Sequence, residues 1–359
     1  METFIIAEAG VNHNGNLDRA IEMVKIAADS GANAVKFQSF KADKIVSFNA
    51  PKAIYQEKNT GKAGSQFEML RELELLEKEQ EILAEECKKN DIEFMSTPFD
   101  IESAVFLAES LNITRFKIGS GELTNAPLLL KLAEFKRPLI LSTGMSNMDE
   151  IRHALSILCF GYSKGLQQPK SFSSFNSFSN NEEIEKILKD YVTVLHCTSN
   201  YPAQPETINL LAIKTLRKTF NLDVGFSDHS EGIFIALGAL ALGACVIEKH
   251  FTLDRQLPGP DHKASLEPEE LNKMIEMIRV LETSIGNGHK IPSRVEKETA
   301  LVARKSLVAI SSIEIGDIFC DKNLGVKRPG IGISPFLYWD YIGKRSNKKY
   351  STDDVIEPQ

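Results

Sequence analysis

The sequence predicts an α/β fold, a (β/α)8 TIM barrel followed by a small, mostly β domain. Eight short β-type runs alternate with helix-type segments in the first 286 residues, and this number and length are typical of such a barrel. Polar residues able to do chemistry stand at the ends of these runs, where barrel enzymes carry their active sites. After residue 286 the helical pattern stops, and short β-type segments separated by turn residues follow.

The expected strands are short apolar runs rich in β-branched and aromatic residues. They comprise residues 4–8, 33–38, 92–97, 115–120, 137–143, 192–197, 223–227 and 244–250. Each strand but the last is followed closely by a helix-type segment, the first of which places Ala20, Met23 and Ala27 on one apolar stripe. The expected helices comprise residues 17–29, 67–89 with at least one break, 102–110, the segment after Pro127, 148–159, 208–220, 232–243 and 268–285. A strand followed by a helix, repeated, predicts parallel strands with crossover helices.

Two segments depart from this alternation. Residues 160–181, which contain SFSSFNSFSN, fit no period and are expected to form a surface loop or a partly disordered insertion. The alternative is that their phenylalanines form a partner-binding patch. Residues 287–300 have the Gly and Pro content of a linker, and residues 301–359 predict the small β domain. A unit of this size has a thin core and gains stability by packing on the barrel or on another subunit.

The composition indicates a globular protein without nucleic-acid or membrane partners. A net charge of −7 argues against nucleic-acid binding, which requires a basic face. The longest apolar run, near residues 233–246, is too short for a membrane span and contains Gly. The first β-type run has no basic region ahead of it, so we expect no signal peptide. Five cysteines without a CxxC pair favour a reducing compartment, and we therefore expect a cytoplasmic protein.

Two histidines stand at the ends of neighbouring expected strands. His229 follows the seventh strand and His250 ends the eighth. Because the carboxyl ends of parallel strands converge on one face, we expect the two imidazoles to lie side by side. Carboxylates stand nearby in the sequence, at Asp228, Glu248 and Asp261. Two imidazoles and oxygen ligands suit a divalent metal such as Mn, Zn, Fe or Co. The alternative is two structural histidines at loop starts, one of them hydrogen-bonded in the core.

Two lysines, Lys36 and Lys117, lie inside expected strands, where a charged side chain must be paired. Lysine supplies point charge, while hydroxyls and loop N–H groups supply directed donors, so together they can cradle a phosphate and a carboxylate. The hydroxyls at neighbouring strand ends are those of Ser96, Thr97, Ser120, Ser142 and Thr143. Any one of them, taken singly, is better explained as a helix N-cap.

Ten motifs occur in the order found in the sialic acid synthase family. They are AEAGVNHNG, AVKFQSF, STPFD, KIGSGE, LSTGM, HCTSNYP, GFSDHS, IEKHF, GPDHKASLEP and KRPGIGISP. The chain resembles this family from Phe4 to beyond Pro335, which implies a metal-dependent barrel (residues 1–286), a linker (287–300) and an antifreeze-like SAF domain (301–359). The stretches IIAEAGVNHNG and GPDHKASLEP are most similar to the legionaminic acid branch. Residues 41–61 are equally similar to bacterial N-acetylneuraminate synthases.

The resemblance implies a reaction between phosphoenolpyruvate and the open-chain aldehyde of an N-acetylmannosamine-type sugar. The products would be phosphate and a nine-carbon 2-keto sugar acid, either N-acetylneuraminate or N,N'-diacetyllegionaminate. A divalent metal, Mn²⁺ or alternatively Mg²⁺ or Co²⁺, would bind His229 and His250, and the catalytic residues would be Glu122, Lys36 and Lys117. The residues expected to bind the substrates are Glu8, Gln38, Thr97, Ser120, Ser142, Tyr201, Ser227, Asp261 and Arg328. Arg328 would reach the site of a partner chain in a domain-swapped homodimer.

Two other functions remain open at this point. One is another barrel enzyme that condenses phosphoenolpyruvate with an aldose, and the other is a non-catalytic sugar-binding relative. Retention of both histidines and both lysines argues against the second. The chain departs from the family at Ser199, where some sialic acid synthases have an Asn that contacts phosphoenolpyruvate. In this chain Thr198 or Asn200 are the alternatives for that contact with phosphoenolpyruvate.

Overall fold

The computed structural model describes residues 2–53, 56–57, 59, 64–165, 167–178 and 182–358. The chain divides into two compact units, Met1–Gly286 and Asn287–Gln359. Several residues of the motif at 41–61 lie outside the described part. No helix in the described ranges is both long and apolar enough to cross a membrane.

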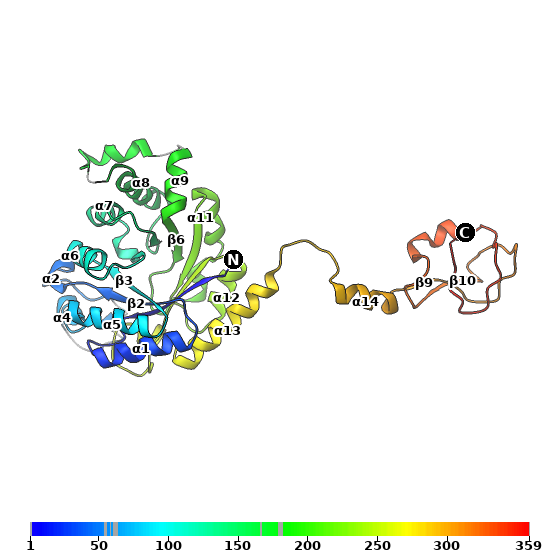
Figure 1. The fold of residues 1–359 in the computed structure, drawn as a ribbon, viewed down its shortest axis with the longest axis horizontal. Coiled ribbons are helices and arrows are strands. Elements are labelled where there is room, and N and C mark those ends of the chain that lie inside the picture. The colour runs from blue at the N-terminus through cyan, green and yellow to red at the C-terminus, as the bar shows by residue number, and fades with distance from the viewer. Residues whose placement is uncertain are drawn as a thin grey trace. The chain divides into compact units, whose positions relative to one another are not determined.

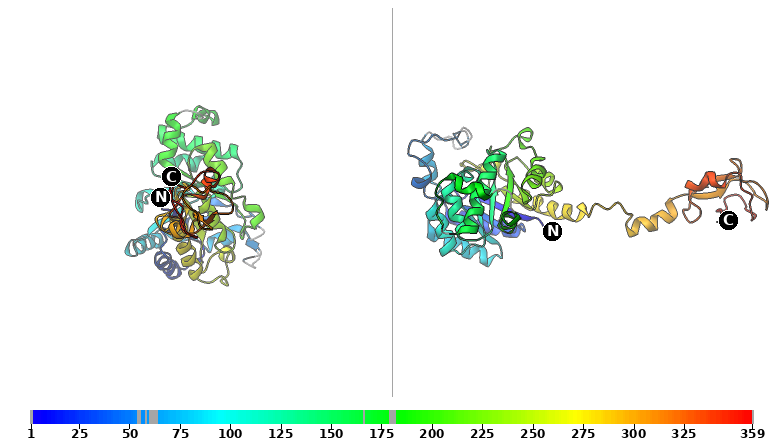
Figure 2. Two further views of the ribbon diagram at one scale, coloured as in Figure 1. Left: turned by 90° about the vertical axis from the view of Figure 1, so that its right-hand side faces the viewer. Right: turned by 90° about the horizontal axis from the view of Figure 1, so that it is seen from above.

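The first unit is a barrel of eight parallel strands with helices around it (Figures 1 and 2). The strands are β1 (Phe4–Gly10), β2 (Ala34–Ser39), β3 (Glu93–Pro98), β4 (Phe116–Ile118), β5 (Leu139–Ser142), β6 (Val192–Cys197), β7 (Asp223–Asp228) and β8 (Val246–His250). Pairing runs in order from β4 to β8, from β8 to β1, and from β1 to β3. Strands β3 and β4 lie side by side and complete the ring. The predicted barrel is confirmed.

Alternation of side chains along the strands divides the barrel interior into layers. The lowest layer is apolar and consists of Ile6, Ala34, Met95, Ile140, Leu195 and Val246. At Gly225 in this region a Cβ atom would lie 2.5 Å from the Val246 carbonyl oxygen, so only glycine fits. Two residues further along the same strands stand buried polar side chains, those of Glu8, Lys36, Thr97, Ser142, Cys197 and Glu248. The interior of the barrel is therefore apolar in its lowest layer and carries polar and charged side chains in the next layer, two residues further along each strand.

Most of the helices described in the first unit pack their apolar faces on the strands or on neighbouring helices. They are α1 (Leu17–Asp29), α2 (Ala42–Ile45), α4 (Gln66–Arg71), α5 (Glu77–Lys89), α6 (Ile101–Val105), α7 (Ala126–Glu134), α8 (Met148–Lys164), α9 (Glu182–Tyr191), α10 (Pro205–Ile208), α11 (Ala212–Phe220), α12 (Phe234–Ala241) and α13 (Pro268–Ile285). Polar caps start several of them, such as Asn147, whose side chain accepts from the Glu150 N–H at the start of α8. The predicted break in the segment 67–89 separates α4 from α5.

The expectation of a loose surface loop at residues 160–181 is wrong for much of that segment. Residues up to Lys164 continue α8, and Phe172–Phe178 form the 3₁₀ helix η3. Phe160 and Phe175 are buried and meet edge to face, with ring centroids 5.3 Å apart. Residues 166 and 179–181 of this segment lie outside the described part. Single phenylalanines set among Ser and Asn leave no period in the sequence, so their burial was not predictable from the pattern.

The second unit contains a small antiparallel pair, β9 (Ser306–Ala309) and β10 (Leu324–Lys327), with short helices η5 (Pro335–Leu337) and α15 (Tyr338–Tyr341). Isolated bridges such as Val308 to Val355 extend the β character, as predicted. Its separate core is formed mainly by Leu307, Phe319 and Tyr350 together with their neighbours. Helix α14 (Arg294–Ala303) lies largely within the segment expected to be a linker.

We predict that the phenylalanine segment stabilises the barrel unit. Phe175→Ala should lower the free energy of unfolding by about 3–5 kcal/mol, because it removes a buried ring from the core. Phe172→Ala, at a ring that is 53% exposed, is the matched control and should lower it by less than about 1 kcal/mol. Urea unfolding followed by circular dichroism measures both. Equal small losses would show that the segment does not belong to the core.

Candidate active site

A cavity of about 530 Å³ opens at the carboxyl ends of the barrel strands. Loops that follow β1, β3, β4, β7 and β8, together with α4, contribute to its walls. The predicted site residues that line it are Glu8, Lys36, Gln38, Thr97, Lys117, Ser120, Glu122, Ser142, Tyr201, Ser227, His229, His250 and Asp261. Arg328 does not line this cavity; it lies exposed in the second unit, directly after β10. The convergence expected from the barrel topology therefore holds for the residues of the first unit.

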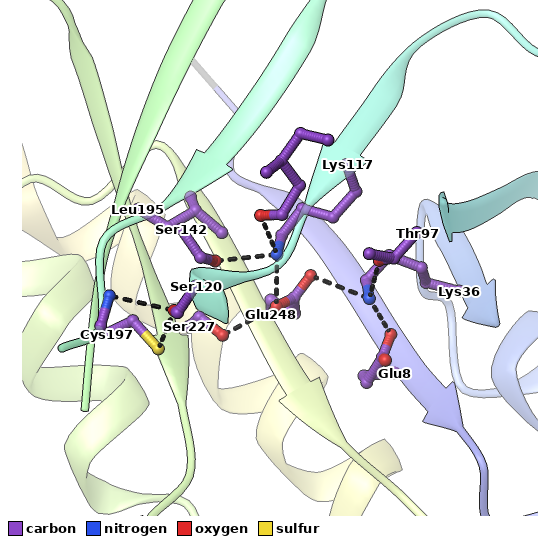
Figure 3. A network of polar contacts seen from close by, with 12 residues as sticks. Glu8, Lys36, Thr97, Lys117, Ser120, Ser142, Leu195, Cys197, Ser227 and Glu248 are labelled. Carbon is purple, nitrogen blue, oxygen red and sulfur yellow. Dashed lines mark hydrogen bonds and ion pairs between the residues drawn. The ribbon is translucent and has the colours of Figure 1, made fainter. Parts of the chain in front are cut away.

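A buried carboxylate links the two lysines on the floor of the cavity (Figure 3). The Glu248 Oε1 atom lies 3.4 Å from Lys117 Nζ, and Glu248 Oε2 lies 3.6 Å from Lys36 Nζ. Lys36 also forms an ion pair of 2.5 Å with Glu8. All four side chains are at most 5% exposed. Two lysines and two acidic side chains thus lie in contact at the cavity floor, largely shielded from solvent.

Hydroxyl groups hold this charged row in place. Lys36 Nζ donates to Thr97 Oγ1 at 3.0 Å, and Lys117 Nζ donates to Ser142 Oγ at 2.8 Å. The Ser227 hydroxyl donates to Glu248 Oε1 at 2.7 Å. Each lysine therefore has a fixed position and still faces the cavity.

The charges shift the pKa values of this row in opposite directions. Burial raises the pKa of Glu8 to about 7, although the Lys36 ammonium opposes the shift. Burial also works against the charge on Glu248, but the Lys117 and Lys36 ammonium groups outweigh it and lower the pKa of Glu248 to about 2. Burial lowers the pKa of Lys117, and Glu248 offsets only part of that effect. Lys36 behaves differently, because Glu248 and Glu8 overcome burial and raise its pKa.

The two histidines lie side by side above this row, with ring centroids 5.4 Å apart. The ring of Tyr201 covers them, 4.1 Å from His229 and 5.5 Å from His250. The Nδ1 atom of His229 lies 2.7 Å from the Thr198 carbonyl oxygen, which can only accept, so Nδ1 carries the proton and Nε2 keeps a free lone pair. The buried Nδ1 atom of His250 has no hydrogen-bond partner among the residues that the structure describes. Burial and the His229 ring hold the pKa of His250 well below its usual value, so its imidazole is neutral.

These two imidazoles fit a divalent metal site. An oriented His229 whose second nitrogen is fixed by a carbonyl is the usual arrangement of a metal ligand. In the described part of the chain, no group of three or more His, Cys, Asp or Glu side chains is close enough to hold a metal by itself. Oxygen atoms of a substrate or of water would have to complete the coordination. Such a site suits Mn²⁺ or a similar ion, because the open positions accept oxygen ligands.

The remaining polar residues occupy the rim and wall of the cavity. Burial raises the pKa of Asp261 to about 6 and also raises the pKa of Glu122, whose carboxylate accepts from the Asn125 amide at 2.6 Å. Two of the hydroxyls expected in the anion cradle are turned away. The Ser96 hydroxyl bonds to that of Ser39, and the Thr143 hydroxyl donates to the Leu195 carbonyl oxygen.

Two carboxylates near the histidines in sequence behave differently from one another. The Asp228 carboxylate does not line the cavity and forms an ion pair of 3.0 Å with Lys249. Glu248, in contrast, is the central residue of the charged row, whereas the sequence indicates it only as one of three carboxylates near the histidines. The alternation of side chains along β8 indicates its position, because Val246, Glu248 and His250 must all face the barrel interior.

An apolar wall of the cavity was also not predicted. Its members are Val11, Phe40, Ile45, Val46, Met69, Leu70, Leu73 and Phe99. Four of them, Val11, Phe40, Met69 and Leu73, form a small buried cluster of their own. The wall combines side chains from several separate segments, such as Ile45 on α2, Met69 on α4 and Phe99 after β3, so no single period in the sequence predicts it.

Residues 23–290 match the NeuB family along most of the barrel unit. The chain belongs to the NeuB family. Among relatives, the N,N'-diacetyllegionaminic acid synthase of Campylobacter jejuni is 47% identical over 99% of this chain and 99% of that protein. The protein of the same name from Legionella pneumophila is 44% identical over 99% of this chain and 94% of that one. The resemblance to sialic acid synthases is thereby confirmed.

A solved structure supports the same assignment of fold. The N-acetylneuraminic acid (sialic acid) synthetase of Leptospira borgpetersenii, crystallised with citrate, is similar with a TM-score of 0.67 and 33% identity. The match covers 83% of this NeuB-family chain and 90% of that one.

We predict that Glu248 is required to keep the two lysines in place. Glu248→Ala should lower the free energy of unfolding by about 3–5 kcal/mol, because it leaves buried ammonium groups without their shared counter-charge. Glu85→Ala breaks the pair with Lys88 on the exposed face of α5 and should cost less than about 1 kcal/mol. Chemical unfolding of the two variants gives the comparison. A loss below 1 kcal/mol for Glu248→Ala would mean that Lys36 and Lys117 do not depend on it.

Proposed function

We propose that this protein condenses phosphoenolpyruvate with the open-chain form of an N-acetylated hexosamine, giving a nine-carbon 2-keto sugar acid and phosphate. The observation that carries the proposal is the buried row Lys36–Glu248–Lys117 directly beside His229 and His250. It combines a site for a small, strongly anionic substrate with a site for a cation that activates a carbonyl. The names of the legionaminic acid synthases support the same reaction class.

Phosphoenolpyruvate binds over the charged row. Its phosphate and carboxylate lie against Lys36 and Lys117, which supply charge without a proton-transfer role. The hydroxyls of Thr97, Ser120, Ser142 and Ser227 surround the two ammonium groups and orient the anion. Because these groups are already fixed, binding requires little reorganisation of the protein.

His229 and His250 hold a divalent metal, Mn²⁺ by preference, with Mg²⁺ and Co²⁺ as alternatives. When bound, the metal supplies Lewis-acid polarisation of the sugar aldehyde. Tyr201 stacks over the histidine pair and closes one side of the site.

The protein then positions the reacting atoms. Carbon 3 of phosphoenolpyruvate attacks the aldehyde carbon, and a water adds to carbon 2. The tetrahedral intermediate loses phosphate by cleavage of the C–O bond, which leaves the 2-keto group. Lys36 and Lys117 hold the charge that develops on the departing phosphate, and Glu122 orients the aldehyde or the water.

The apolar wall favours a deoxygenated sugar. Glu8, Gln38, Tyr201 and Asp261 provide the polar contacts for the sugar near the reacting end. Among the described residues this wall is mainly apolar, with Gln56 and Gln66 as its polar members, and it carries no cation that would pair with a phosphate. It fits the methyl group and the acetamido groups of a 2,4-diacetamido-2,4,6-trideoxymannose. N-acetylmannosamine is therefore the weaker substrate of the two.

The active form in this proposal is a cytoplasmic homodimer in which the antifreeze-like unit of one chain, residues 301–359, covers the barrel of its partner. Arg328 is exposed in that unit and would complete the partner's sugar site. Large exposed side chains, those of Phe336 and Trp339, give the same unit an apolar surface suited to burial against a partner. All five cysteines are free thiols, which supports the cytoplasm.

Phosphate release tests the proposal directly. The full-length protein with phosphoenolpyruvate and Mn²⁺ is assayed with the diacetamido sugar, with N-acetylmannosamine and with arabinose 5-phosphate. We expect the highest kcat/KM with the diacetamido sugar. His229→Ala and His250→Ala should each reduce kcat/KM by at least roughly 100-fold, because they remove an activating group from the site. His153→Ala, at an exposed histidine on α8, is the control and should leave the rate unchanged.

Other results would assign another function. Turnover with arabinose 5-phosphate alone would identify a different phosphoenolpyruvate–aldose synthase. No phosphate release with any sugar, combined with sugar binding, would indicate a non-catalytic relative.

A further inference from the structure

Strands β7 and β8 carry two cross-strand pairs immediately before the histidines. Ser227 lies opposite Glu248, and Asp228 lies opposite Lys249. Because side chains alternate, the first pair faces the barrel interior and the second faces the helices. His229 directly follows β7, and His250 is the last residue of β8. The relative position of the two imidazoles therefore depends on how these strand ends are fastened together.

The outward pair forms a closed polar cluster. Lys249 Nζ lies 3.0 Å from Asp228 Oδ2, and both side chains are fully buried. Lys249 also donates to the Ser230 carbonyl oxygen at 2.5 Å. Asp228 Oδ1 in turn accepts from the Ser230 N–H at 2.9 Å and from its hydroxyl at 2.6 Å. Lys249 thus contacts Asp228 and Ser230, the residues on both sides of His229. Lys249 itself directly precedes His250 in the chain.

Stability alone does not account for such a cluster. A buried ion pair recovers little more than the free energy of desolvating its charges, and well-packed apolar residues often do as well. What the pair provides is a fixed geometry, since each hydrogen bond specifies an atom on the opposite strand. Neither residue lines the cavity, so neither can contact a substrate.

We propose that Asp228 and Lys249 are positioning residues that set the spacing of His229 and His250 for a shared metal ion. This inference rests on the proposed metal site. Other bonds fix the histidines individually, namely those from Ala203 N–H to the His229 carbonyl oxygen at 2.8 Å and from Leu266 N–H to the His250 carbonyl oxygen at 2.9 Å. Only the Asp228–Lys249 cluster ties the two strand ends to each other on the outer side, within the described residues. Outer residues that orient metal ligands affect metal affinity by roughly 10–100-fold.

Titration of the full-length protein with Mn²⁺ alone, followed by electron paramagnetic resonance, tests the proposal. Lys249→Met keeps the shape of the side chain and removes its charge. Asp228→Asn keeps an oxygen for the Ser230 N–H and weakens the link to Lys249. We expect both variants to bind Mn²⁺ at least roughly 10-fold more weakly than the wild type. Arg115→Met breaks the ion pair of 2.9 Å with Glu93 near the starts of β3 and β4, and this control should bind Mn²⁺ normally.

The outcomes separate the positioning role from a structural one. Circular dichroism identifies the fraction of each variant that is folded, and the Mn²⁺ affinity is taken from folded protein. If Lys249→Met does not fold, Asp228→Asn decides the question. Folded variants with reduced stability and unchanged Mn²⁺ affinity would overturn the proposal while leaving the metal site intact. A wild type that does not bind Mn²⁺, or that binds it equally well after His229→Ala, would overturn both.

Discussion

The shared carboxylate of Glu248 is the interaction on which the rest of the site depends. Two lysines inside a barrel would repel each other and would favour their neutral forms, because burial penalises charge. Glu248 reaches both of them, and the Glu8 carboxyl group contacts Lys36 from the other side. The row remains charged while presenting ammonium groups to the cavity. An incoming dianion would find positive charge that is already fixed, which makes electrostatic stabilisation effective.

Because every second side chain of a strand faces the barrel interior, the interior groups form successive layers along the barrel axis. The apolar layer at Ile6 and its neighbours closes the bottom of the barrel, and the charged row lies one pleat above it. The next interior positions on β7 and β8 lead to His229 and His250. Water is thereby excluded from below, the two lysines lie at the floor, and the two histidines lie above them. The same strand geometry that specifies the fold specifies the order of the reacting groups.

Much of this arrangement could be predicted from the sequence, because strands and their carboxyl ends follow directly from local patterns. Lys36, Lys117 and the two histidines were found because a charged residue in a β-type run needs a reason to be there. The features that could not be predicted depend on tertiary packing and leave no periodic pattern in the sequence. The pattern predicts a loop at Phe175 because an isolated aromatic has no periodic signal, and the apolar wall combines side chains from separate segments, such as Phe40 and Met69, that no single period connects. Asp228 and Glu248 looked equivalent until alternation placed them on opposite faces.

A crystal structure of the protein grown with Mn²⁺ and phosphoenolpyruvate tests the central claim most directly, using anomalous scattering to locate the metal. The account predicts one Mn²⁺ bound by a ring nitrogen of His229 and one of His250. It also predicts phosphate and carboxylate oxygens within hydrogen-bonding distance of Lys36 and Lys117. A metal bound elsewhere, or phosphoenolpyruvate out of reach of both lysines, would contradict it.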